Sequence, residues 1–261
     1  MRIFGLIGKS LSHSFSQQYF TQKFHQQKIN DAEYHLFSLS NIHEIKDLFK
    51  LPALLGFNVT IPYKTEIIPF LDGLDKVAQE VGAVNCVVKE GNRWVGYNTD
   101  VVGFGQMLHE IPRYARNDKP ALVLGAGGAA KAVCYVLKQK NIPFQIVSRK
   151  KTEQTITYDE VTEELIRHSS FIINTTPLGM FPNINEMPQI PYAALNSEHI
   201  LIDLIYNPEE TLFLKEGKNR GALTVNGLEM FYAQAEASYI IFKTNFNTRV
   251  SISKTCAAST V

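Results

Sequence analysis

Residues 121–131 read Ala-Leu-Val-Leu-Gly-Ala-Gly-Gly-Ala-Ala-Lys, and this stretch decides the fold of the second half of the chain. A short apolar run ends in Gly-x-Gly-x-x-Ala and passes directly into a helical pattern. Such a turn lets backbone N–H groups approach a pyrophosphate, and the N-terminus of the following helix favours its negative charge. The pattern predicts a dinucleotide-binding unit, with an ordinary tight strand–helix turn as the alternative.

The next apolar run, Phe144–Val147, is followed by Ser148, Arg149, Lys150 and Lys151. An NAD-binding unit usually has a carboxylate about 20 residues after its glycines, where it binds the ribose 2′-hydroxyl. Here that region is cationic, so it would accept a 2′-phosphate. The sequence therefore predicts NADP as the cofactor, unless the cationic side chains merely face water.

The composition is that of an ordinary globular protein with a small-molecule partner. The chain has 261 residues, 45% of them apolar and 20% charged, with a formal net charge of +1. Such a balance gives no sign of a nucleic-acid or anionic-membrane partner. The longest apolar runs are too short for a signal peptide or a membrane span, so we expect neither.

The three cysteines, Cys86, Cys134 and Cys256, are far apart in the sequence. They lack the spacing of metal ligands, so we expect reduced thiols, no bound metal and a cytoplasmic location.

Two lobes with a cleft between them are expected, both of the α/β class. The first hundred residues alternate strand-like and helix-like segments, including a β-hairpin with a Gly-Asn turn near residues 83–97. From residue 121 the order becomes β-α-β, which predicts a parallel sheet covered on both faces, that is, a Rossmann-type doubly wound domain. Helices are expected at 15–28, 42–50, 74–80, 101–111, 128–140, 159–167, 209–219 and 228–244, the last packing back on the first domain.

Three polar segments of the first hundred residues could take part in chemistry. In Gly56–Lys64, the side chains of Asn58 and Thr60 share one face at a strand end, and Lys64 follows. Amide, hydroxyl and ammonium groups in one place suit a polyhydroxylated anionic substrate. Alternatively, Asn58 and Thr60 cap a turn and Lys64 is solvated.

The other two polar segments lie next to predicted helices. Asp100 precedes an apolar helix, where it could be the N-cap or could form a proton-transfer pair with Lys64. Ser14 and Ser16 stand at the first turn of a helix, where their hydroxyls could bind an anion or simply cap the helix.

Eight motifs, in order along nearly the whole chain, resemble those of the shikimate dehydrogenase family. They are His13–Ser16, Gly56–Lys64, Gly82–Asn85, Asn98–Gly103, Gly125–Ala129, Asn174–Met180, Asp203–Pro208, and Asn226–Met230 with Gln234. There are departures: Gln17 stands where the family usually has proline, Cys86 where it has threonine, and Ser148 where it has asparagine.

The resemblance implies NADP-dependent reduction of 3-dehydroshikimate to shikimate, a step of chorismate and aromatic amino acid biosynthesis. It implies a substrate domain of residues 1–101 plus 229–261 and an NADP-binding domain of residues 102–228. Lys64 and Asp100 would be the catalytic pair. Substrate contacts would come from Ser14, Ser16, Asn58, Thr60, Asn85, Tyr206 and Gln234. Cofactor contacts would come from Gly125, Ala126, Gly127, Gly128, Ala129, Ser148, Arg149, Lys150, Lys151, Thr152, Leu204, Gly227 and Met230.

Two alternatives remain open. A quinate/shikimate dehydrogenase able to use NAD would have the same serines and the same Lys64/Asp100 pair, and only the cationic stretch argues against it. A non-catalytic NADP-sensing protein should have lost Lys64 or Asp100, and both are present. We expect a monomer or a homodimer.

Overall fold

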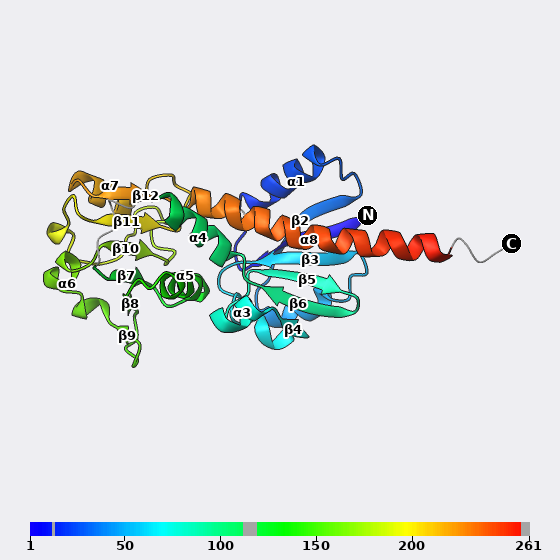
Figure 1. Ribbon diagram of the computed structural model, residues 1–261, viewed down its shortest axis with the longest axis horizontal. Coiled ribbons are helices and arrows are strands. Elements are labelled where there is room, and N and C mark those ends of the chain that lie inside the picture. The colour runs from blue at the N-terminus through cyan, green and yellow to red at the C-terminus, as the bar shows by residue number, and fades with distance from the viewer. Residues whose placement is uncertain (12–13, 112–118, 257–261) are drawn as a thin grey trace. The chain divides into compact units, whose positions relative to one another are not determined.

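The structure, a computed structural model, describes residues 1–11, 14–111 and 119–256, with the side chains of the last helix described as far as Lys243. The chain divides into two compact units. The first unit comprises Met1–Thr99 and Gln234–Val261, and the second comprises Asp100–Ala233. The chain therefore passes from one unit to the other twice, after Thr99 and after Ala233 (Figure 1).

The first unit is built on a mixed six-stranded sheet in the order β2-β1-β3-β5-β6-β4. Its strands are β1 (Arg2–Gly8), β2 (Ala32–Ser38), β3 (Leu54–Val59), β4 (Gly73–Leu74), β5 (Cys86–Glu90) and β6 (Arg93–Tyr97). Strand β1 runs parallel to β2 and β3, whereas β5 is antiparallel to both β3 and β6. The helices are α1 (Ser16–Gln26), α2 (Ile45–Leu48), α3 (Lys76–Val81) and most of α8 (Leu228–Cys256).

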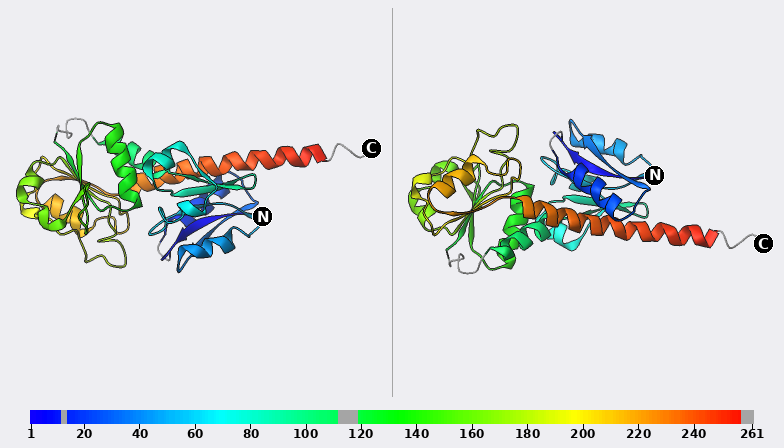
Figure 2. Two further views of the ribbon diagram at one scale, coloured as in Figure 1. Left: turned by 90° about the horizontal axis from the view of Figure 1, so that it is seen from below. Right: turned by 90° about the horizontal axis from the view of Figure 1, so that it is seen from above.

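Strand β3 is buried along its whole length because this sheet has an apolar core on each face. One core joins Phe4, Phe20 and Phe242, so α8 packs against this face of the sheet (Figure 2). The other core contains Phe57 and Trp94. The polar ends of β3 and of its neighbours are thus held on a rigid support.

The second unit is built on an all-parallel six-stranded sheet in the order β12-β11-β10-β7-β8-β9, which confirms the predicted doubly wound sheet. Its strands are β7 (Ala121–Leu124), β8 (Phe144–Val147), β9 (Thr155–Ile156), β10 (Phe171–Asn174), β11 (Ile200–Asp203) and β12 (Leu223–Val225). The helices are α4 (Asp100–Glu110), α5 (Gly128–Gln139), α6 (Glu163–Arg167) and α7 (Leu212–Asn219). Alternate residues of β7 enter different cores, Ala121 and Val123 on one face and Leu122 and Leu124 on the other.

Several predicted boundaries were wrong. The helix expected at 159–167 is a 3₁₀ turn, Tyr158–Glu160, followed by the short helix α6, because Val161 is extended and Thr162 caps a new helix. The helix expected at 42–50 is likewise a 3₁₀ turn, Ile42–Glu44, followed by α2. Helix α8 continues to Cys256, well beyond the predicted end at 244. Strands β4 and β9, two residues each, have too little periodicity to be predicted.

Candidate functional site

The two predicted anion-binding serines lie at the beginning of α1. Ser16 is its first residue and is buried, while Ser14 is half-buried. The hydroxyl of Ser14 accepts the backbone N–H of Ser16 at 3.2 Å. The N-cap of α1 is Phe15, which makes no side-chain cap hydrogen bond, so neither serine is the N-cap that the alternative interpretation expected. The two hydroxyls still lie at a helix N-terminus, where an anion is stabilised. His13 of the same motif lies outside the described residues.

The segment that follows β3 fixes the backbone of Lys64. Tyr63 is buried, and its hydroxyl donates to the carbonyl oxygen of Leu39 at 2.7 Å. The carbonyl oxygen of Lys64 accepts the backbone N–H of Val84 at 2.7 Å. The side chains of Thr60 and Lys64 are half-buried. The ammonium group is therefore on a segment anchored at two successive residues.

Asn58 is buried, and its amide group is hydrogen-bonded within the first unit. Its Oδ1 accepts the hydroxyl of Tyr34 at 2.9 Å. Its Nδ2 donates to the carbonyl oxygen of Asn85 at 3.2 Å and to Oγ of Ser238 at 2.8 Å. Because both amide hydrogens have protein acceptors, the arrangement suits a residue that orients its neighbours better than one that donates to a ligand.

Asn85 joins three predicted site segments. Its Oδ1 accepts the backbone N–H of Thr99 at 2.6 Å, and its Nδ2 lies 3.4 Å from Oε1 of Gln234. Nearby, Nδ2 of Asn98 donates to the carbonyl oxygen of Ala83 at 2.8 Å. Asn98 and Thr99 are thus tied to the segment before β5, and they directly precede the buried Asp100. Asp100 is the first residue of α4.

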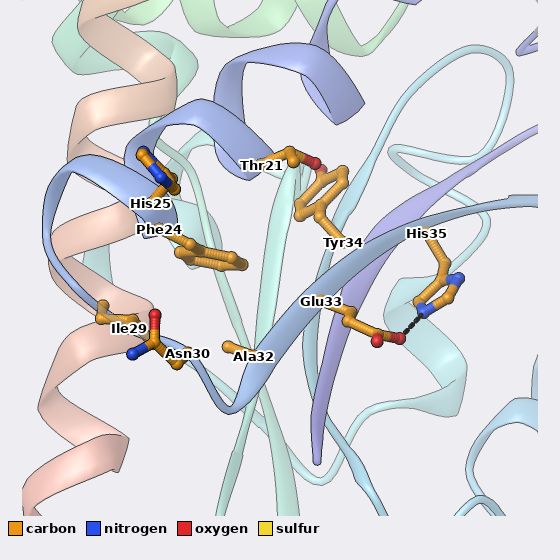
Figure 3. Close-up of a pocket in the computed structure, with 9 residues that line it drawn as sticks. All are labelled: Thr21, Phe24, His25, Ile29, Asn30, Ala32, Glu33, Tyr34 and His35. Atoms are coloured by element: carbon orange, nitrogen blue, oxygen red, sulfur yellow. Dashed lines mark hydrogen bonds and ion pairs between the residues drawn. The ribbon is translucent and has the colours of Figure 1, made fainter.

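A cavity of about 290 Å³ lies between α1 and β2 in the first unit (Figure 3). It includes none of the residues predicted to bind substrate. Tyr34 connects the two regions, because it lines the cavity and its hydroxyl bonds Asn58. The lining residues are Thr21, Phe24, His25, Ile29, Asn30, Ala32, Glu33, Tyr34 and His35.

In the second unit, the glycine-rich turn lies where three parallel strands end. Gly125 follows β7 with φ of +111°, a conformation that favours glycine, and a Cβ there would lie 2.6 Å from Oγ1 of Thr175. Its N–H donates to the carbonyl oxygen of Val147 at the end of β8. Gly127 is the N-cap of α5, and a Cβ there would have no neighbour within 4 Å. The turn therefore offers open backbone at a helix N-terminus, which fits a pyrophosphate.

The cationic stretch after β8 is not uniform. Arg149 and Lys150 are exposed, and the N–H of Lys150 lies 3.4 Å from Oγ of Ser148. Lys151 instead forms an ion pair with Glu160. The hydrogen bond from Lys151 is the main reason that the pKa of Glu160 falls to about 2. Arg149 and Lys150 are therefore better placed than Lys151 to meet an added phosphate.

Thr152, the last residue of the predicted cofactor stretch, is exposed, and its Oγ1 lies 2.9 Å from Oγ1 of Thr155. This contact closes the turn that connects β8 to β9.

The remaining predicted cofactor residues lie near the ends of β11 and β12. Gly227 is buried, and a Cβ there would lie 2.1 Å from the carbonyl oxygen of Leu204. The ring of Tyr206 packs on Phe231 with centroids 4.8 Å apart. Met230 is buried in the core shared with β7 and α5. The structure thus brings Leu204 and Gly227 into direct backbone contact.

Asp203 is a buried carboxylate to which the sequence analysis gave no role of its own. Oδ1 accepts from Nδ2 of Asn174 at 3.0 Å and from the N–H of Ile205 at 3.1 Å, and Oδ2 accepts the hydroxyl of Thr211 at 2.6 Å. Burial raises its pKa to about 6, and these hydrogen bonds offset part of the rise. Asp203 therefore ties together the loops that follow β10 and β11.

Within the described part of the chain, no group of histidine, cysteine or acidic side chains is arranged to hold a metal ion. Among the helices described, none combines the length and apolar character needed to cross a membrane.

The all-parallel sheet, with its glycine turn at the N-terminus of α5, defines a two-unit α/β protein with a Rossmann-type dinucleotide-binding unit. Residues 6–87 match the model of the shikimate dehydrogenase substrate binding domain.

A shikimate dehydrogenase (NADP(+)) from Clostridium beijerinckii is 41% identical over 90% of this chain and 89% of its own. The crystal structure of shikimate dehydrogenase 1 from Peptoclostridium difficile is 36% identical, with a TM-score of 0.83 over 94% of this chain and 92% of its own. Shikimate 5-dehydrogenase from Thermus thermophilus, solved in complex with NADP(H) and shikimate, is 27% identical, with a TM-score of 0.79 over 93% of both chains. The chain belongs to the shikimate dehydrogenase family.

Proposed function

We propose that the protein is an NADP-dependent shikimate dehydrogenase, which interconverts 3-dehydroshikimate and shikimate. The observation that carries this proposal is the joint anchoring of the two predicted catalytic segments. The backbone of Val84 holds Lys64, and the side chain of the next residue, Asn85, holds Thr99, which precedes Asp100. The named activity of the Clostridium beijerinckii relative supports the same reaction.

The first unit supplies the substrate contacts in this proposal, and the second supplies the cofactor contacts. The substrate carboxylate binds the hydroxyls of Ser14 and Ser16 at the N-terminus of α1. Thr60, Asn85 and Gln234 bind the ring hydroxyls, and Tyr206 lies at the reacting end. Asn58, whose amide is internally bonded, holds this set in place.

The residues of the second unit fit NADP. The turn from Gly125 to Ala129, which is open at Gly127, binds the pyrophosphate. Arg149 and Lys150, which are exposed, bind the 2′-phosphate. Leu204, Gly227 and Met230 form the nicotinamide side of the pocket. When bound, the reduced cofactor supplies the hydride.

Lys64 and Asp100 carry the proton transfer. Reduction of a ketone leaves negative charge on oxygen, and the Lys64 ammonium stabilises that charge and donates the proton. The Asp100 carboxylate attracts and orients the ammonium. In the oxidative direction the Lys64 amine accepts the proton of the alcohol.

Two alternative functions predict different results in a turnover assay. A quinate/shikimate dehydrogenase would oxidise quinate and use NAD. The exposed Arg149 and Lys150 argue against NAD as its cofactor. A cofactor-sensing protein would bind NADP without turnover. Steady-state assays of shikimate and quinate, each with NADP⁺ and NAD⁺, distinguish the three. A cytoplasmic location is part of this proposal, and it fits the free thiols of the buried Cys86 and the half-buried Cys134.

A further inference from the structure

The Ser238 hydroxyl lies within a buried polar cluster of the first unit. Ser238 has no solvent exposure. Its Oγ accepts from Nδ2 of Asn58 at 2.8 Å and lies 3.0 Å from Oγ1 of Thr99, where either hydroxyl can donate. Burial raises the pKa of the nearby Cys86 thiol to about 12, and a hydrogen bond with Ser238 offsets part of this rise. We call Asn58, Asn85, Thr99 and Ser238 the Ser238 cluster.

The cluster reaches the predicted substrate residues through Asn85. Oγ1 of Thr99 lies 2.9 Å from Nδ2 of Asn85 and 3.2 Å from its Oδ1. The same Nδ2 lies 3.4 Å from Oε1 of Gln234. Gln234 and Ser238 are one helical turn apart, so they share a face of α8. That face of α8 therefore contacts the cluster at two successive turns.

One connection between the units begins at a member of this cluster, Thr99, and the other ends at Gln234, which contacts the cluster through Asn85. The chain leaves the first unit after Thr99 and returns to it at Gln234. The backbone N–H of Thr99 donates to Asn85, and its hydroxyl bonds the Ser238 hydroxyl. Gln234 contacts Asn85. Asp100, the proposed partner of Lys64, follows Thr99 directly.

An ordinary helical serine would bond differently. Serine within a helix typically points to solvent or donates to the carbonyl oxygen one turn earlier. The Ser238 hydroxyl instead bonds side chains from β3 and from the segment before α4. Removing it would leave Nδ2 of Asn58 without one of its two buried acceptors, which is costly.

We propose that Ser238 is a positioning residue of the substrate site, which fixes the amides of Asn58 and Asn85 and, through Thr99, the segment that carries Asp100. This inference rests on the proposed function, since Asn85 and Asp100 act on the substrate only if that function holds. It concerns a residue of α8 that makes no proposed contact with substrate or cofactor.

The test compares Ser238→Ala with Ser170→Ala. Ser170 is equally buried, and its hydroxyl donates to the carbonyl oxygen of Lys119 at 2.7 Å, in the second unit. We expect Ser238→Ala to lower kcat/KM for shikimate about tenfold, with the Kd of NADP⁺ unchanged, because it disturbs only the substrate side. Ser170→Ala should leave both values close to those of the wild type.

A second measurement does not need turnover. Hydrogen exchange of the Thr99 backbone amide, the donor to Asn85, should become about tenfold faster in Ser238→Ala and stay unchanged in Ser170→Ala. If Ser238→Ala does not fold, Thr99→Val removes the other hydroxyl at nearly constant shape and should give the same selective loss of kcat/KM.

The two proposals fail in different ways. If the wild type oxidises shikimate but Ser238→Ala matches Ser170→Ala in kinetics and exchange, the positioning role is overturned and the function stands. If the wild type does not oxidise shikimate with NADP⁺, the proposed function fails, and the substrate-positioning role fails with it. Faster exchange at Thr99 would then show only that Ser238 orders this segment.

Discussion

Gly227 packs directly on the backbone of Leu204, so closely that a Cβ on Gly227 would lie 2.1 Å from the carbonyl oxygen of Leu204 and 2.5 Å from its carbonyl carbon. Both atoms belong to the backbone and cannot turn aside. Any residue larger than glycine must therefore move the loop after β11, which also carries Tyr206.

Gly227→Ala should weaken NADP⁺ binding about tenfold and lower Tm, because overpacking of this kind costs about 1–3 kcal/mol. Isothermal titration with NADP⁺ and a thermal melt measure the two effects. Gly105→Ala is the matched control, since a Cβ at this position of α4 meets nothing within 4 Å. That variant should bind NADP⁺ as the wild type does. Equal affinity and Tm in Gly227→Ala and the wild type would refute the packing argument.

Arg149→Asp should weaken NADPH binding strongly and narrow the preference for NADPH over NADH, because it puts a negative charge where the 2′-phosphate is expected. Lys151→Ala should have a much smaller effect, since Glu160 already neutralises Lys151. Kd values for NADPH and NADH in the two variants measure the difference. A larger loss in Lys151→Ala than in Arg149→Asp would reassign the phosphate contact to Lys151.

Lys64→Ala should lower kcat by about 10²–10⁴-fold while KM for shikimate stays closer to normal, because the ammonium acts mainly on charge that develops in the transition state. Steady-state kinetics measure the split. Lys76→Ala, which removes an exposed lysine of α3, should have no effect on kcat. A change in KM alone would make Lys64 a binding residue.

The raised pKa of Asp203 leads us to expect that the free energy of unfolding depends on pH. Its pKa is raised in the folded protein to about 6, so its contribution to stability is fully present below about pH 4 and is lost as the pH rises through 6. A rise of about two units corresponds to about 3 kcal/mol. Asp203→Asn keeps the shape without the titration.

Urea unfolding at pH 4.5, 5.5 and 7 measures this effect. The free energy of unfolding of the wild type should fall relative to that of Asp203→Asn as the pH rises, and taking the difference removes the contributions of other carboxylates. Curves that stay parallel across this range would contradict a raised pKa at Asp203.

The second unit could be predicted in outline because its signals are local. Buried parallel strands give continuous apolar runs, and the turn after β7 needs glycine at Gly125 for its positive φ. The first unit was predicted less well. The antiparallel pairing of β3 with β5 depends on contacts between segments that the intervening helices separate in sequence.

The residues of the candidate site likewise fall into those that a local motif identifies and those that only the fold identifies. Lys64, Asp100 and the glycines stand in short motifs, so a resemblance could identify them. Ser238 and Tyr34 have no such motif, and their importance comes only from where the fold places Asn58. The pairing of Lys151 with Glu160 likewise depends on the turn after β9, which the sequence predicted as a helix.

The most direct test of the central claim is a steady-state assay of purified protein, with shikimate and quinate each offered NADP⁺ and NAD⁺. We expect turnover of shikimate with NADP⁺ and a higher kcat/KM with NADP⁺ than with NAD⁺. Absence of shikimate turnover with NADP⁺, or a higher kcat/KM for quinate with NAD⁺, would contradict the account.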